Sequence, residues 1–358
     1  MHRDTISNIQ FSQPTNFLIT ASIDGHVKFW KKKDKDLSSA ADTGGKKNNT
    51  ANMTMAQKAK MAQESGKDLT FLGESIEFVK QYRSHIHDVT VLQLSNDQKL
   101  ACTACAKEKS LKVYDVGNFD MISIHKFTTI RPNRCVFTTN DNINRKFVVA
   151  ADETTGTIEV IDIDTLRHEL KTEDEGVEKQ EELPTVIKVS DSVITSMFFH
   201  ESDQTIVLFH LNGAINFLDP ETRTLSKRKL KNHQDLYNLQ KDKTFALSTS
   251  LNAAESKFAV YCADKSIRVF NYNSGKQIAK IDESIEKIRE NLEKFSVLDK
   301  MEFEQRVIHE MKLEKEIKEY QDNGIAPPKN ICSDVQFRDL DGDLLIYPTV
   351  IGLRMAGI

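Results

Sequence analysis

Glycine and proline are scarce in this sequence of 358 residues, which contains 14 glycines and 7 prolines. Its turns must therefore be made mainly with Asp, Asn and Lys. The five cysteines are odd in number and scattered, which argues against a disulfide framework and favours a reducing compartment. No apolar run approaches the ~20 residues of a membrane helix, and the polar start Met1–Asp4 lacks the apolar core of a signal peptide. We therefore expect no membrane association.

An excess of positive charge is also absent, since 49 Lys and Arg residues face 53 Asp and Glu residues, a net charge of −4. Proteins that bind nucleic acids usually carry a strongly basic surface, so we expect no direct nucleic-acid binding. RNA binding by the basic part of the first insertion described below stays an alternative. The composition, 39% hydrophobic and 28% charged, is that of an ordinary globular protein. The length suits two average domains or one large all-β domain.

One sequence pattern recurs along the chain: a β-rich run that ends in a small residue, a polar turn, and a strand of alternating apolar and polar residues that ends in a large apolar residue. Five clear copies and a weaker sixth lie at 17–30, 100–115, 147–162, 206–219, 258–270 and 344–355. Alternation with period two places one face of each strand on an apolar core. The copies resemble WD repeats, whose period is ~40–45 residues, with modest additions in the loops. We therefore predict an all-β, WD-repeat β-propeller of about six blades, with an unrelated β-sandwich as the alternative.

Two wider gaps between copies predict insertions rather than missing blades. Residues 32–74 are rich in Lys, Ala, Ser, Thr and Asn, and should form a mostly disordered loop between the third and fourth strands of blade one. Residues 283–323 carry apolar residues at helical spacing and should form charged helices before the last blade. Their apolar stripes pack on the propeller, bind a partner, or do both. The candidate partner-binding residues are Phe303, Val307, Met311, Ile317 and Tyr320.

The Cys-x-x-Cys spacing of Cys102 and Cys105 is the one pattern that suggests metal or redox chemistry. These cysteines lie on a predicted strand, where residues three apart face opposite sides of the sheet. No second pair is present. We therefore interpret both as core cysteines and predict no metal site and no cofactor.

Several polar and aromatic residues recur at matching places in the repeat and are predicted to be structural. The histidines fall in the turn that leads into a blade, the aspartates in the turn after its second strand, and the aromatic residues at the end of its third strand. These structural blade positions are His2, Asp24, Trp30, His85, Tyr114, Asp264 and Phe270. We predict no catalytic residue.

Some stretches resemble one known family. They are Thr20–Lys32 with Ile76–His85, Val113–Val116 with Phe119–Ile122, and Phe270–Glu283 with Met301–Arg306. The sequence resembles the peptidylprolyl isomerase domain and WD repeat-containing proteins, which are nuclear cyclophilins, over nearly the whole chain outside the first insertion. The resemblance implies an N-terminal propeller of seven blades followed by a cyclophilin domain, a nuclear location, and spliceosomal proteins as partners.

We expect parts of this family's architecture to be missing from the sequence. It stops at Gly357 and Ile358, within the expected sixth blade, so we expect an incomplete propeller without the seventh blade and without the cyclophilin domain. The cyclophilin motifs Phe-Met-Ile-Gln-Gly-Gly and Gly-Thr-Gly-Gly do not occur in the sequence, so we assign isomerase activity to none of its residues. We therefore expect a protein-interaction scaffold. Peptidyl-prolyl cis–trans isomerase activity, by family membership, is the alternative.

Overall fold

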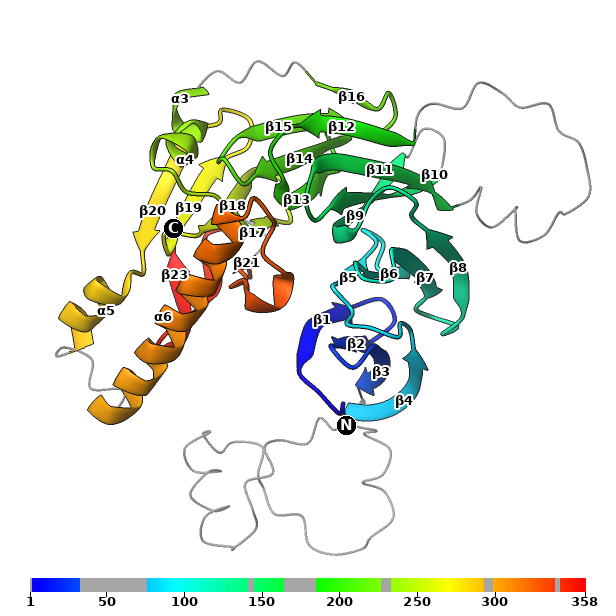
Figure 1. The fold of residues 1–358 in the computed structure, drawn as a ribbon, viewed down its shortest axis with the longest axis horizontal. Helices are drawn as coiled ribbons and strands as arrows, with labels where there is room; N and C mark the ends of the chain where they lie inside the picture. Colours follow the sequence, from blue (N-terminus) through cyan, green and yellow to red (C-terminus); the bar gives the residue numbers. More distant parts are fainter. Residues whose placement is uncertain are drawn as a thin grey trace, which may run out of the picture.

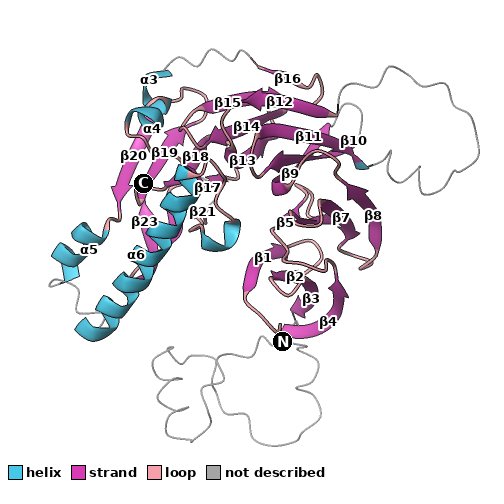
Figure 2. Ribbon diagram, viewed as in Figure 1, coloured by secondary structure: helices cyan, strands magenta, loops and turns pink. Residues whose placement is uncertain are grey.

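The computed structural model describes residues 2–32, 76–140, 145–163, 185–226, 233–292, 299–338 and 342–358. The predicted loop insertion 32–74 lies outside these ranges except for Lys32, which ends a strand. Strands make up about half of the described residues, and the longest helices lie to one side of them (Figure 2). None of the described helices combines the length and the apolar character that crossing a bilayer requires.

Six antiparallel sheets follow one another along the chain, and we call them blades one to six. Blade one is β1 (Ile6–Ser12), β2 (Phe17–Ser22), β3 (His26–Lys32) and β4 (Ile76–Arg83). Blade two is β5 (Val91–Leu94), β6 (Leu100–Cys105), β7 (Ser110–Asp115) and β8 (Met121–Lys126). Blade three is β9 (Pro132–Asn140), β10 (Arg145–Asp152), β11 (Gly156–Asp162) and β12 (Val186–Ser190).

The other three blades repeat the same up-and-down order. Blade four is β13 (Ile194–His200), β14 (Thr205–His210), β15 (Ile215–Asp219) and β16 (Thr224–Leu225). Blade five is β17 (Ala246–Leu251), β18 (Lys257–Cys262), β19 (Ser266–Asn271) and β20 (Gln277–Asp282). Blade six has three strands, β21 (Gln336–Phe337), β22 (Leu344–Thr349) and β23 (Gly352–Gly357). The helices are α3 (His233–Leu236), α4 (Asn238–Lys241), α5 (Ile285–Leu292), α6 (Lys300–Asp322) and η2 (Lys329–Ile331).

The large apolar residues of the repeat occupy matching positions in the third strands of their blades. Trp30 pairs with Leu18 in blade one, Tyr114 with Ala101 in blade two, and Phe270 with Phe258 in blade five. In each blade the residue two places earlier on the third strand pairs with the middle of the second strand. The predicted WD-repeat propeller of six blades is therefore confirmed.

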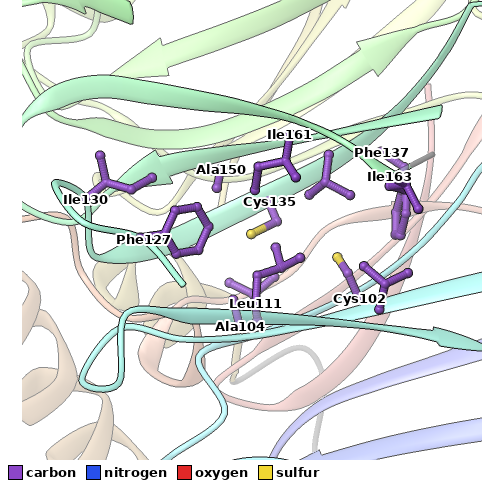
Figure 3. Packing of buried hydrophobic residues seen from close by; sticks show 13 residues of the cluster. Cys102, Ala104, Leu111, Phe127, Ile130, Cys135, Phe137, Ala150, Ile161 and Ile163 are labelled. Atoms are coloured by element: carbon purple, nitrogen blue, oxygen red, sulfur yellow. The ribbon is translucent and has the colours of Figure 1, made fainter. Parts of the chain in front are cut away.

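The blades follow one another around a common axis, with the first strand of each blade on the inside (Figure 1). Each neighbouring pair shares an apolar core, as alternating strands predict. Between blades two and three, for example, Cys102 and Leu111 pack with Cys135 and Ile161 (Figure 3). This placement agrees with the interpretation of Cys102 as a core residue. Similar clusters join blades one and two, three and four, four and five, and five and six.

The two ends of this arc are not joined by a core cluster or a shared sheet among the described residues. On β1, Ile9 is 58% exposed, whereas Leu92 at the same register position of β5 is fully buried against blade one. At the other end, Leu353 and Met355 of β23 are also exposed. The apolar faces that cover one another between neighbouring blades are therefore open on the outer sides of blades one and six.

Candidate functional site

In blade one, the loop before the first strand is tied to the second and third strands by buried polar side chains. His2 Nε2 lies 2.8 Å from Thr20 Oγ1, and the indole N–H of Trp30 donates to the same hydroxyl at 2.9 Å. His2 Nδ1 lies 3.7 Å from the carboxylate of Asp24. Burial raises the pKa of Asp24, but hydrogen bonds from the backbone N–H groups of His26 and Arg3 outweigh it and lower the pKa to about 2. This carboxylate is therefore ionised near neutral pH.

Blade two uses a similar network around a fully buried histidine. His85 Nε2 lies 3.0 Å from Thr103 Oγ1, and His85 Nδ1 lies 3.1 Å from Ser110 Oγ and 3.3 Å from Glu108 Oε2. The Tyr114 hydroxyl lies 2.7 Å from that of Ser84, the residue before His85. Both imidazole nitrogens have protein partners, so His85 links the segment before blade two to the strands of that blade.

The same region contains the one group of potential metal ligands that the described residues bring together. Ligand atoms of His85, Cys105 and Glu108 lie within 4.8 Å of one another. Burial raises the pKa of the Cys105 thiol, which opposes the thiolate that a metal ion needs. Glu108 also receives hydrogen bonds from the backbone N–H groups of Ile86 and His87. We interpret the group as part of the blade-two network.

In blades five and six, residues that the sequence analysis missed form polar networks that connect the strands and loops of the blades. Arg268, buried on β19, donates to Asp264 at 2.9 Å and lies 2.9 Å from Asp242 in the loop before the blade. Glu283, in the loop before blade six, accepts hydrogen bonds from Tyr347 at 2.9 Å and from Arg354 at 2.7 and 2.8 Å. Because the residue types differ from blade to blade, the sequence repeat does not reveal them.

The long helix α6 is held against blade five and the loop between β22 and β23. Phe303 and Val307 are buried in a cluster with Ile288 of α5 and Val350. The Glu310 carboxylate forms an ion pair with Lys265, in the turn between β18 and β19. Further along, Ile317 is buried with residues of blades five and six. The helix is therefore a fixed part of the molecule.

These contacts correct part of the predicted partner-binding set. Phe303, Val307 and Ile317 are buried, so they pack on the propeller and are closed to a partner, whereas Met311 is 58% exposed. Tyr320 is partly buried. A second apolar stripe, missed in the sequence, faces solvent: Met301 is 71% and Ile308 is 68% exposed. We call Met301, Ile308 and Met311 the outer face of α6.

After α6 the chain crosses the axis of the propeller. We call residues 325–335, which include η2, the axial loop. The N–H of Ala326 donates to the Glu153 carbonyl, and the Ala326 carbonyl accepts from the side chain of Asn133, so the loop reaches blade three. The guanidinium of Arg134 donates to the carbonyl of Pro327 at 2.9 Å. The axial loop thus connects blades that lie far apart around the ring.

A cavity of about 280 Å³ lies beside the axial loop, lined by the first strands of blades two to five. Its lining includes Gln93, Arg134 and Ser250 from these strands and Lys329 and Asp334 from the loop. The first strands run in the same direction around a propeller axis, and Arg134 is near the beginning of β9, whereas Ser250 is near the end of β17. The cavity therefore extends along the axis, with the loop at one end.

Comparison with known proteins agrees with the fold. The family model described as WD domain, G-beta repeat matches residues 1–31. The whole chain aligns with the human protein named peptidylprolyl isomerase domain and WD repeat-containing protein 1, with 27% identity over 365 residues. It also aligns fully with peptidyl-prolyl cis-trans isomerase cyp15 of Rhizopus delemar, at 25% identity, and with isomerase CYP71 of Arabidopsis thaliana, at 24%. The resemblance to these proteins is confirmed.

The chain spans about half the length of the curated relatives it matches, 46% of the human protein and 48% of the fungal one. The isomerase activity that their names state is therefore said of those longer proteins. The part shared with this chain is the WD-repeat region.

Proposed function

We propose that this chain is a protein-interaction scaffold that works with splicing proteins in the nucleus. The observation that carries the proposal is the outer face of α6: three exposed apolar side chains on a helix of 23 residues that is anchored to blade five. An anchored helix loses little conformational freedom when a partner binds, so its apolar face is well suited to recognition. The splicing partners and the nuclear location rest on the family resemblance alone.

A triple variant tests the scaffold proposal. Met301→Ser, Ile308→Ser and Met311→Ser remove the outer face, while the matched control replaces Gln305, Lys312 and Glu319 of the same helix, all exposed, with serine. Both proteins are tagged and incubated with nuclear extract, and spliceosomal small nuclear RNAs in the captured fraction are quantified. We expect several-fold lower recovery with the triple variant only. Equal recovery from both would remove α6 from the proposal, and no recovery with the unaltered chain would refute the splicing role.

The alternative function, prolyl isomerisation, has support only in the names of the longer relatives. The polar side chains around His2 and His85 are hydrogen-bonded within their blades. We expect the chain to leave the rate of cis–trans isomerisation of a proline peptide unchanged. A rate increase that cyclosporin inhibits would make the isomerase the better proposal.

A further inference from the structure

We propose that the axial cavity binds a carboxylate group of a partner protein. The proposal rests on the scaffold function and specifies the chemistry that one partner would present. It concerns the cavity beside the axial loop, which is separate from the outer face of α6.

Charge at the loop end of the cavity favours an anion. Arg134 is 7% exposed, and its hydrogen-bond acceptors are the carbonyl oxygens of Thr195, Asn133 and Pro327 and the side-chain oxygen of Asn133, together with a long contact to the thiol of Cys332. No described carboxylate forms an ion pair with it. Carbonyl dipoles compensate a buried charge only in part, so a nearby anion would be stabilised.

The carboxylate of Asp334 is the one acidic group that lines the cavity among the described residues. It already accepts a hydrogen bond from Ser248 at 2.6 Å and lies 3.9 Å from the ammonium group of Lys329. Counting Arg134 and Lys329 as positive and Asp334 as negative leaves one net positive charge on the lining. A cationic ligand would therefore meet repulsion, whereas an anionic one would be attracted.

The cavity lining also offers hydrogen-bond donors. Ser250 Oγ accepts from the N–H of Phe337 at 3.4 Å, and its O–H has no acceptor among the described residues, so it can donate to a ligand. The amide of Gln93 has no hydrogen-bond partner among the described residues, and Gln93 is only partly buried. These two groups can donate to the oxygens of a carboxylate in the cavity, while the Lys329 ammonium adds positive charge at the loop end.

The size of the cavity limits how much of a partner it can hold. Its volume of about 280 Å³ lies just below the roughly 300–1,000 Å³ of pockets that enclose a whole small ligand. It therefore suits one acidic side chain or one chain terminus, with the remainder of the partner on the outside. Either source supplies the same chemistry.

Three short probes test the site on the whole chain by ligand-observed NMR titration: N-acetyl-Ala-Glu amide, its Gln analogue, and N-acetyl-Ala-Ala with a free carboxyl terminus. Losing a charge-assisted hydrogen bond costs about tenfold in affinity or more, so the Gln probe should bind at least about tenfold more weakly than the Glu probe. If the Glu probe binds more tightly than the free terminus, the partner group is a side chain; the opposite order assigns a chain terminus.

Two variants and a control complete the test. Lys329→Gln and Gln93→Leu should each weaken the Glu probe severalfold, while Lys280→Gln, on the outer strand of blade five, should leave its affinity unchanged. Equal binding of the Glu and Gln probes, equal loss in the Lys280 control, or no binding of any probe would overturn the proposal. Because the probes do not involve α6, these outcomes are independent of the capture experiment on the scaffold function.

Discussion

The attachment of blade six to blade five depends on Glu283, which is 5% exposed and follows the last strand of blade five. Its carboxylate accepts hydrogen bonds from Tyr347 on β22 and from Arg354 on β23. The Glu283→Gln variant keeps the size of the side chain and one acceptor oxygen, but removes the negative charge beside Arg354. It therefore isolates the ionic part of the link between the two blades.

The free energy lost in Glu283→Gln depends on how exposed Arg354 is. A hydrogen bond to a charged group contributes about 1.5–3 kcal/mol. The side chain of Arg354 is 43% exposed, so water partly replaces the lost contact, and we reduce the estimate to about 1–2 kcal/mol. Because 1.4 kcal/mol is a factor of ten, local opening of blade six should become about 5–30 times more frequent.

Hydrogen exchange followed by mass spectrometry measures this opening directly. Peptides that cover β22 and β23 should exchange about 5–30 times faster in Glu283→Gln than in the unaltered chain, while peptides from blade two keep their rates. The control is Glu286→Gln, which changes an exposed residue of α5. Unchanged exchange of β22 and β23 in Glu283→Gln would refute the reasoning that this carboxylate holds blade six.

Three other properties of the molecule give predictions. Burial lowers the pKa of His85, so the unfolded chain binds the proton first as the pH falls. The free energy of unfolding in urea should therefore be highest above about pH 6.5 and decrease below it, with a smaller decrease in His85→Asn. A rise in this free energy toward pH 5 would contradict the prediction. A Cβ on Gly25 would lie 2.2 Å from the His85 carbonyl oxygen, whereas one on Gly324 would meet nothing within 4 Å. Both glycines have positive φ, so Gly324→Ala should cost about 1 kcal/mol and Gly25→Ala about 2 kcal/mol more in urea unfolding; equal costs would exclude the clash. Phe303→Ala should destabilise the packing of α6 by about 3 kcal/mol and accelerate its proteolysis. Met311→Ala, at an exposed position of the same helix, should change stability by less than about 0.5 kcal/mol. Similar proteolysis of the two variants would show that Phe303 does not anchor the helix.

The propeller could be predicted because its signal is local and repeated. Each blade contains an alternating third strand that ends in a large side chain, and a single copy such as Val27–Trp30 already shows the alternation. Repetition at similar spacing then indicates a ring or an arc. The pairing of Trp30, Tyr114 and Phe270 at one register position follows from that pattern.

The polar networks could be predicted only where residue types repeat. His2 and His85 share a residue type and a place before the blade, whereas Glu283 holds the same place before blade six with a different type. Arg268 at the centre of a strand looks like an exposed residue in the sequence. Its burial depends on Asp242, from a loop 26 positions away, which local patterns do not show.

The helical insertion shows another limit of local patterns. Helical spacing identifies the stripe through Phe303 and Val307 but misses Met301 and Ile308, and it does not tell which face of α6 meets the propeller. Only the positions of Ile288 and Val350 decide it. The axial loop depends on still longer contacts, since Ala326 meets Glu153 across the axis.

An experimental structure of the chain is the most direct test of the account. It should show six successive sheets around one axis, with α6 against blade five and residues 325–335 crossing to blade three. Its electron density should place Trp30, Tyr114 and Phe270 at equivalent positions of their third strands. Sheets that do not follow one another around an axis, or an α6 detached from Lys265, would contradict the account.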